Sequence, residues 1–339
     1  MARKATSFDI AQLAGVSQPT VSRALRGNAA VSEHTRKRIE AIAQQLHYTV
    51  DKNASSLRRR ESKTLALLLF EDPTPDDSLI NPFFLSMLGS ITRTCALRGY
   101  DLLISFQQLS SDWHVDFEDS RKADGIILLG YGDYDEYAQR LDQLVAQGTH
   151  FVRWGSVQPG AAETVVGCDN AQGGRAVTQH LIDLGRRRIA FIGTATSGSP
   201  EFLDRYRGYA EALSLAGLET SLTLQADSIS TEEEGHEATL RLLRRDASFD
   251  AIVAASDLIA IGAIRALKEA GLAVPADVAV TGFDDILAAS MANPPLTTVA
   301  QDSRAAGEAL VDTLLALIRG EGAPSTVLPA RLVVRQSSG

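Results

Sequence analysis

The sequence contains 339 residues, enough for about two domains of ordinary size, and its 45% hydrophobic and 22% charged residues exclude wholesale disorder. The apolar runs at 65–70 and 125–130 are far too short to span a bilayer, and the first residues lack the apolar stretch of a signal peptide. The formal net charge of −9 argues against nucleic acid as a partner of the chain as a whole. We therefore expect a cytoplasmic protein that has no membrane partner.

The charge is distributed unevenly along the chain. Residues 1–60 hold 11 basic and 4 acidic residues, a net charge of +7, whereas the rest holds 22 basic and 38 acidic residues, a net charge of −16. A small basic segment ahead of a large acidic one is typical of a protein in which only the basic part contacts a polyanion. A solvated basic helix face is the alternative, and the pattern within the first sixty residues decides between them.

Three helices are predicted in the basic segment. A short helix over 9–14, with Leu13 among its apolar side chains, ends at a glycine. Ser17 is a good N-cap for a second helix over 18–25, whose first turn tolerates a proline. A third helix begins at the Ser32 cap and carries an apolar stripe that can pack on the other two. Helix, glycine turn and short polar helix in this order are typical of a helix-turn-helix domain.

The second of these helices carries the side chains suited to DNA. If it enters the major groove, Gln18 and Arg23 can make directional contacts, glutamine best to adenine and arginine best to guanine. Pro19 offers only an apolar contact, for example to a thymine methyl group. The short hydroxyl side chains are suited to phosphates, which position the protein without specifying a sequence: Ser17, Thr20 and Ser22.

Segment 17–25, S-Q-P-T-V-S-R-A-L, resembles the recognition-helix signature V-S-x-x-T-V-S-R-x-L of the LacI/GalR family of bacterial transcription regulators. Residues 35–39 and 46–48 also fit that family's third helix and its end. The resemblance implies a hinge helix that orders only on DNA and inserts a leucine into the minor groove, where an apolar wedge kinks the duplex. Leu57 occupies that place, and Arg58 behind it would contact phosphate. A flexible basic linker is the alternative.

From residue 64 onward, short apolar runs alternate with helical stretches of ten or more residues. This alternation predicts βαβ units, and so parallel sheets covered by helices on both faces. The strands are expected over 65–70, 101–106, 125–129, 151–154, 165–168, 189–192, 251–254 and 278–281. The helices are expected over 82–98, 134–147, 171–184, 202–216, 233–244 and 258–270.

The sequence lacks the motifs that would carry an enzyme reaction. No G-x-G-x-x-G follows a strand, no G-x-S-x-G nucleophile elbow is present, and residues 193–200 imitate the spacing of a P-loop without its lysine. The six histidines and two cysteines show neither metal-ligand spacing nor a disulfide framework. We therefore expect a protein that is no enzyme and needs neither a cofactor nor a metal ion.

The resemblance to the LacI/GalR family continues through the rest of the chain. The matching motifs are N-P-F-F at 81–84, D-N-x-x-G at 169–173, R-x-x-G at 205–208, S-D-x-x-A-x-G at 256–262, G-F-D-D at 282–285 and P-P-L-T-T-V-x-Q-D at 294–302. They imply a small all-α helix-turn-helix head and an α/β core of two Rossmann-like lobes of the periplasmic-binding-protein type. The implied bounds are 1–50 for the head, 51–62 for the hinge and 63–339 for the core, with 63–164 and 295–325 in lobe 1 and 165–294 and 326–339 in lobe 2.

The same resemblance implies an effector between the lobes, with contacts at Phe83, Arg205, Ser256, Asp284 and Gln301. Arg205 and Asp284 together offer a donor fork and an acceptor, which suits the vicinal hydroxyl groups of a sugar. The resemblance therefore predicts a polar site without catalytic chemistry.

Two neighbouring residues of the predicted strand 151–154 are further candidates. Trp154, together with Phe83, offers a flat apolar face to the C–H side of a pyranose, and packing in the core is an equally good interpretation. Arg153 stands where some relatives carry an acidic sugar ligand. It indicates either a more acidic effector or an ion pair between the lobes.

We therefore expect a homodimeric repressor of a carbohydrate-utilisation operon that binds a palindromic operator and is controlled by a small effector, a mono- or oligosaccharide. Within this class, a purine-type corepressor or a sugar phosphate is the alternative. A stand-alone sugar-binding protein is the alternative of another class. The residues after 326–335 show no leucine-heptad extension, which favours a dimer over a tetramer.

Overall fold

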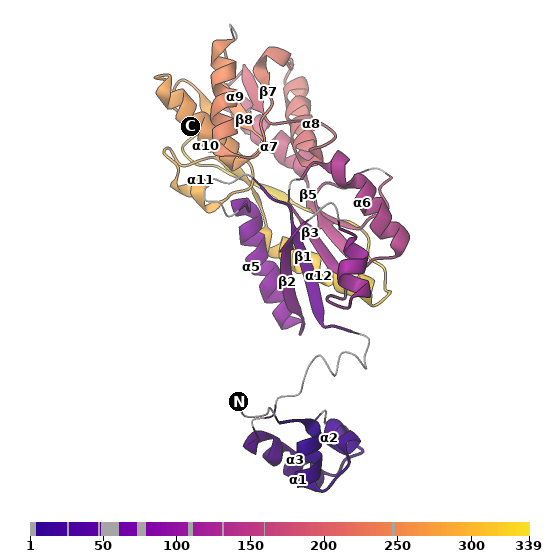
Figure 1. Ribbon diagram of the computed structural model, residues 1–339. Helices are drawn as coiled ribbons and strands as arrows, with labels where there is room; N and C mark the ends of the chain where they lie inside the picture. The colour runs from indigo at the N-terminus through magenta and orange to yellow at the C-terminus, as the bar shows by residue number, and fades with distance from the viewer. Residues whose placement is uncertain are drawn as a thin grey trace. The chain divides into compact units, whose positions relative to one another are not determined.

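The computed structural model of the protein (Figure 1) describes residues 5–25, 27–46, 48, 61–72, 79–107, 111–130, 132–158, 160–245 and 248–339. The chain divides into two compact units, Met1–Ser62 and Lys63–Gly339. The described part of the first unit is helical, and the second unit is built on parallel sheets. Within the described residues, no helix is long and apolar enough to cross a membrane.

Three helices form the head, as the sequence predicts: α1 (Ser7–Ala14), α2 (Gln18–Ala24) and α3 (Glu33–Gln45). The Thr6 and Asp9 side chains form a reciprocal capping box at the start of α1. The helices pack around Ile10, Val21 and Ile39, which are fully buried. The small core of the head therefore has one fully buried large apolar side chain from each helix at its centre, with other apolar side chains packed around them.

One expectation for α1 is wrong. Leu13, predicted on the apolar face, is 63% exposed. It lies two residues, or about 200° around the helix, from the buried Ala11, and so it faces solvent.

Two parallel sheets form the centre of the second unit, as the alternation predicts. The first has the strand order β11-β5-β4-β3-β1-β2 and the second the order β7-β6-β8-β9, and β10 and β12 form a separate antiparallel pair. The strands are β1 (Thr64–Leu69), β2 (Asp101–Phe106), β3 (Ile126–Leu129), β4 (Phe151–Trp154), β5 (Val165–Cys168), β6 (Ile189–Ile192), β7 (Gln225–Ala226), β8 (Ala251–Ala254), β9 (Ala279–Thr281), β10 (Thr298–Gln301), β11 (Thr326–Leu328) and β12 (Ala330–Val333).

The helices of the second unit pack in pairs, α5 on α12, α7 on α8 and α9 on α10 (Figure 1). Glycines allow two of these pairs to approach closely. A Cβ on Gly208 would lie 2.0 Å from the Ala171 carbonyl oxygen, and one on Gly262 would lie 2.0 Å from the Glu232 carbonyl oxygen. The helices are α5 (Pro82–Leu97), α6 (Tyr134–Gln147), α7 (Asn170–Asp183), α8 (Pro200–Leu215), α9 (Glu232–Arg244), α10 (Asp257–Glu269), α11 (Leu287–Met291) and α12 (Ser303–Ile318), with a π-helical turn at His114–Asp119 and a 3-10 turn at Leu222–Leu224.

The sheet topology differs from the implied lobe bounds at three places. β5 pairs with β4, and β11 pairs with β5, so both lie in the first sheet although the bounds assign them to lobe 2. Conversely, residues 297 and 300 form isolated β-bridges with residues 281 and 284 beside the second sheet. The implied bounds assign 297 and 300 to lobe 1. The chain therefore changes sheets after Cys168, after Gln301 and after Leu328. At each place a strand is completed first, because its backbone groups need a neighbouring strand to bond.

Candidate DNA-contacting helix and effector cavity

Ser17 stands at the N-cap of α2, as predicted, but its hydroxyl group does not bond the helix backbone. The Ser17 Oγ and Thr20 Oγ1 atoms hydrogen-bond to each other at 2.9 Å. A cap side chain normally accepts from the second or third N–H of the helix. Here Pro19 has no N–H, and the N–H of Thr20 donates to the Ser17 carbonyl oxygen. Both hydroxyl groups therefore stay together at the start of α2.

The predicted DNA contacts of α2 divide by exposure: Ser17, Pro19 and Arg23 are exposed, and Gln18, Thr20 and Ser22 are half-buried. The Gln18 Nε2 atom donates to Ser7 Oγ on α1 at 3.2 Å, so part of its amide group is used within the head. Arg23 is therefore the more accessible of the two predicted base-reading side chains. The predicted minor-groove wedge Leu57 and its neighbour Arg58 lie outside the described residues.

Arg205, predicted to contact the effector, lies at the centre of a buried network. The side chain is on α8, and the residue is 1% exposed. Its Nε donates to Asn170 Oδ1 at 2.8 Å, and its Nη1 donates to the Ala255 carbonyl oxygen. Its Nη2 lies 3.5 Å from Asp284 Oδ1, and the guanidinium group lies 3.8 Å from the centroid of the Phe283 ring. One cation thus connects the start of α7, the end of β8 and the loop after β9.

Gln301 and Asp284 also lie together, as the resemblance implies. The Gln301 Nε2 atom donates to Asp284 Oδ1 at 2.6 Å, and Asp284 has a φ of +114°, which is rare for a residue with a side chain. Behind them, burial and the charge of Asp284 raise the pKa of Asp257. The Asp257 carboxyl group accepts from the Thr298 hydroxyl and the Ile286 N–H. The polar groups predicted to hold an effector are therefore bonded to other protein groups.

Ser256 caps α10. Its Oγ accepts from the N–H of Ile259 at 3.4 Å and bonds Ser230 Oγ at 2.8 Å, and the residue is fully buried. Ser230 also accepts from Asn81 Nδ2 at 3.1 Å, and Asn81 is the N-cap of α5 beside the first sheet. A chain of three hydrogen-bonding side chains therefore joins the two sides of the core.

Arg153 forms a buried ion pair. Its Nε donates to Glu163 Oε1 at 3.0 Å, and its Nη2 donates to the Ser156 carbonyl oxygen at 2.8 Å. This pair does not join the lobes, because Arg153 is on β4, Glu163 directly precedes β5, and both strands belong to the first sheet. Of the two interpretations of Arg153, the ion pair between the lobes is therefore wrong, and the more acidic effector stays a prediction. The charge of Arg153 is thus balanced within the protein.

Phe83 and Trp154 pack against each other, with ring centroids 6.0 Å apart. They are 1% and 4% exposed and belong to the main hydrophobic core. Both aromatic side chains therefore pack in the core, and their contact with an effector stays a prediction.

A cavity of about 160 Å³ lies between the carboxyl ends of the two parallel sheets. Its described lining follows strands β1, β3, β6 and β7: Glu71, Asp72, Gly132, Thr194, Ser199, Glu201, Phe202, Ser228, Ile229, Ser230 and Thr231. None of the seven predicted effector contacts is among these described lining residues. Arg205 lies directly behind, with its guanidinium 5.3 Å from the Phe202 ring centroid. Ligands of parallel sheets bind beyond the carboxyl ends of the strands, and that rule would have found Glu71 and Thr194.

The cavity lining is acidic and rich in hydroxyl groups. It contains the carboxylates of Glu71, Asp72 and Glu201 and five serine or threonine hydroxyls, and no Lys, Arg or His is found among its described residues. Glu201 Oε1 accepts from the N–H of Ser156 at 2.9 Å, which connects α8 to the segment after β4. Burial raises the pKa of Asp72 to about 6. The lining is suited to a ligand that donates hydrogen bonds and carries no negative charge.

Replacing Asp72 by asparagine is expected to change the pH dependence of stability. Because burial raises the pKa of Asp72 from its ordinary value of 3.8 to about 6, the folded core keeps a proton that the unfolded chain releases. The wild-type core therefore loses stability as the pH rises from about 4 through about 6, by at most about 3 kcal/mol. The Asp72→Asn variant should lack this loss in urea denaturation at about pH 5 and about pH 7.5.

Glu71→Gln is the control for this experiment, because Glu71 is the exposed neighbour of Asp72. This control should keep the wild-type pH profile. A wild-type profile in Asp72→Asn as well would contradict the assignment of the pH dependence to Asp72.

Two family descriptions match the chain. "Bacterial regulatory proteins, lacI family" matches residues 8–51, and "Periplasmic binding protein-like domain" matches residues 178–338. The HTH-type transcriptional regulator CelR of Thermobifida fusca is 33% identical over 341 residues, which cover 99% of this chain and 98% of that protein. The head and the core of this chain are therefore both similar to regulators of one family.

Solved structures agree along the whole chain. A transcriptional regulator CelR–cellobiose complex has a TM-score of 0.73 at 32% identity, over 98% of this chain and 99% of that chain. A lac repressor dimer bound to operator and the anti-inducer ONPF has a TM-score of 0.86 at 25% identity, over 99% of both chains. With its helix-turn-helix head and its periplasmic-binding-protein-like core, the chain belongs to the lacI family of bacterial regulatory proteins and is a DNA-binding transcriptional regulator.

Proposed function

We propose that this regulator represses a carbohydrate-utilisation operon, binds a palindromic operator as a homodimer, and is controlled by an uncharged sugar in the cavity between the two sheets. The lining of the cavity carries the effector assignment: carboxylates and hydroxyls accept and donate hydrogen bonds, while Phe202 and Ile229 offer apolar surface. The CelR complex with cellobiose and the lac repressor dimer with operator support the same combination of sugar, DNA and dimer.

The alternatives differ in the charge that the cavity would have to accept. A sugar phosphate needs cationic partners. The two arginines among the predicted effector contacts already form ion pairs within the protein, Arg153 with Glu163 and Arg205 with Asp284. A purine-type corepressor would use the Phe202 ring. A stand-alone sugar-binding protein has no use for a basic helix-turn-helix head. The relatives are regulators rather than enzymes, so we propose that the ligand is bound and released unchanged.

The proposal for DNA binding covers the whole head and the hinge that follows it, not only α2. The bounds are 1–50 for the head and 51–62 for the hinge, with the core following from residue 63. Leu57 as a minor-groove wedge and Arg58 as a phosphate contact are part of it. The exposure of Arg23 on α2 supports the proposal, because a base-reading side chain must reach beyond the surface of its own domain.

A thermal-shift screen against sugars, sugar phosphates and purines tests the effector. A ligand that binds only the folded protein adds about 2.7 kcal/mol of stability at 100 times its Kd. We expect the shift with a neutral mono- or disaccharide. A shift with a purine or a sugar phosphate and with no neutral sugar would overturn the uncharged-sugar assignment and leave the DNA-binding function standing.

The proposed dimer has a suitable apolar face on the first sheet. β2 is an edge strand of that sheet, and its Leu103 and Ile104 are 38% and 47% exposed. Leu97 at the end of the neighbouring α5 is 70% exposed. An exposed apolar edge strand is a place where another chain pairs.

Ile104→Glu is expected to convert the dimer to monomers, because it places a charge at the centre of this apolar edge. Light scattering after size-exclusion chromatography measures the mass. Leu222→Glu is the matched control, since Leu222 is 83% exposed and lies beside the second sheet. A dimer that persists in Ile104→Glu would exclude this edge as the interface.

A further inference from the structure

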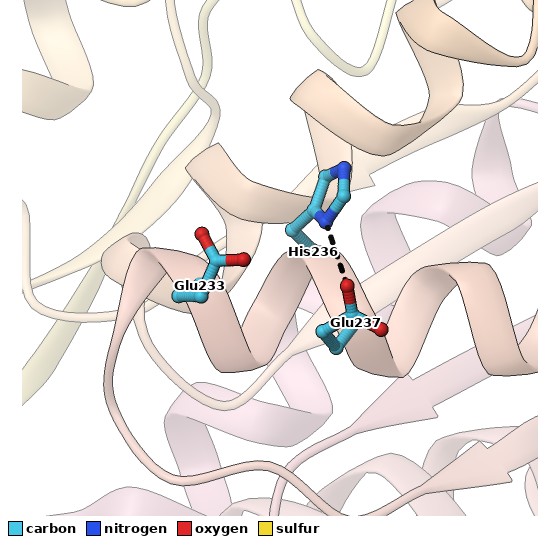
Figure 2. Close-up of side chains that lie close together, drawn as sticks. All are labelled: Glu233, His236 and Glu237. Carbon is cyan, nitrogen blue, oxygen red and sulfur yellow. Dashed lines mark ion pairs between the residues drawn. The ribbon is translucent and has the colours of Figure 1, made fainter.

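A cluster of potential metal ligands lies on α9, the helix that begins directly after Thr231 of the cavity lining. Glu233, His236 and Glu237 stand at positions i, i+3 and i+4 of the helix, so they share one face, and one ligand atom of each lies within 4.8 Å of the others (Figure 2). We propose that these three side chains bind a divalent transition-metal ion, for which Zn²⁺ is the best match. The sequence argument against a metal considered only the spacing of histidines and cysteines, and so it overlooked a site with one histidine and two carboxylates.

The hydrogen bonds of His236 leave one ring nitrogen available as a ligand. Its Nε2 lies 2.7 Å from Glu269 Oε2, and because a carboxylate only accepts, the proton is on Nε2. Its Nδ1 is buried and makes no hydrogen bond to any described residue, and the side chain is 10% exposed. In the neutral ring, therefore, a buried lone pair faces the carboxylate of Glu237, an arrangement that a cation between them would stabilise.

The distance between Nδ1 and Glu237 Oε1 is 3.5 Å, too long for a good hydrogen bond (Figure 2). Zinc binds nitrogen and carboxylate oxygen at about 2.0–2.2 Å, and two ligands at a tetrahedral angle are then about 3.4 Å apart. The observed spacing therefore suits a bridging metal ion better than a direct contact. Glu233 can provide the third ligand, and water can take the fourth position.

The packing of α10 on α9 holds this cluster in place. Because Gly262 of α10 lies close to the Glu232 carbonyl oxygen of α9, Arg265 and Glu269 of α10 lie against the α9 cluster. Arg265 donates to Glu233 Oε2 at 2.7 Å and lowers the pKa of that carboxyl group, while the second oxygen of Glu233 stays available. Glu269 orients the imidazole through its bond to Nε2, the usual role of a carboxylate behind a metal-binding histidine.

The charge around the cluster favours a cation. Segments 232–237 and 265–269 carry five carboxylates against two basic residues, Arg265 and Lys268. A dication reduces the repulsion between these carboxylates, and it binds only when the histidine is neutral.

The test is a metal titration of the full-length, tag-free protein after removal of bound metal with a chelator. We expect one Zn²⁺ per chain by calorimetry with a micromolar Kd, and one Co²⁺ per chain by its visible absorption. His236→Gln and Glu237→Gln should each weaken binding at least about tenfold, and Glu269→Gln should weaken it by about tenfold through the histidine. Glu237 is 44% exposed, so its variant keeps the fold even if the His236 variant is destabilised.

Glu234→Gln is the matched control, because Glu234 is on the same helix and outside the cluster of three. It should bind zinc as the wild type does. Absence of saturable binding at micromolar metal, or binding that Glu237→Gln and Glu269→Gln leave unchanged, would overturn the site.

Discussion

Alanine in place of Arg23 is expected to weaken specific operator binding strongly while the core binds its effector unchanged. Arg23 is exposed on α2, and a bidentate arginine–guanine contact contributes about 1–3 kcal/mol of discrimination. A dimer uses the contact twice on a palindrome, so at least about 2 kcal/mol, or about 30-fold in affinity, should be lost. The measurement is a binding titration with DNA that the wild-type protein has selected from a random library.

Two comparisons make the Arg23 result specific. Binding to random DNA at low salt should fall much less, because phosphate contacts of the rest of the head remain. Gln18→Ala should cost less than Arg23→Ala, since the Gln18 amide group is already bonded to Ser7 Oγ. Undiminished affinity of Arg23→Ala for the selected DNA would remove α2 as the base-reading helix.

The head could be predicted almost completely from the sequence, because its determinants are local. The Ser32 cap, the glycine turn after α1 and the spacing of Val21 in α2 each act within a few residues. Leu13, which was predicted on the apolar face and is exposed, shows the limit of periodicity in a helix of two turns. There, Ile10, Ala11 and Ala14 set the buried face, and Leu13 stays outside it.

The fold class of the core could be predicted from the sequence, but the pairing of its strands could not. Apolar runs separated by helices predict parallel sheets, yet they do not say which sheet a strand joins. β5 and β11 join the first sheet because of partners that are distant in the sequence, with Thr326 aligned to Val166. The lobe bounds therefore needed the structure.

The candidate effector site was predictable in part. The resemblance brings Arg205, Asp284 and Gln301 together, and they do lie together. The partner of Arg153 depends on the pairing of β4 with β5. The acids of the cavity depend on how the two sheets close over one another, which no local pattern encodes. Glu201, for example, stands at the start of α8 and reaches the N–H of Ser156 from the opposite side of the core.

Replacing Arg205 by methionine is expected to destabilise the core by about 3–5 kcal/mol, the cost of removing one partner of a buried ion pair. Methionine keeps much of the side-chain length, but it leaves Asn170, the Ala255 carbonyl oxygen and Asp284 without their shared donor. The loss is measured by urea denaturation of the core. Arg207→Met is the matched control two residues later, where the side chain is 62% exposed and pairs with Asp204 of its own helix. It should change stability little.

The origin of the Arg205 effect can be separated by adding Asp284→Asn. If the uncompensated charge of Asp284 causes the loss, the double variant should regain part of the stability that Arg205→Met loses, because no buried anion then lacks its cation. Removing the charge of Asp284 also lowers the free-energy cost of ionising Asp257, because that charge raises the pKa of Asp257. A double variant no more stable than Arg205→Met would instead assign the loss to packing on Phe283 and to the hydrogen bonds that tie α7 and β8 to α8. In either case Arg205 acts from behind the cavity, because it ties α8, whose first turn lines the cavity, to the start of α7, the end of β8 and the loop after β9.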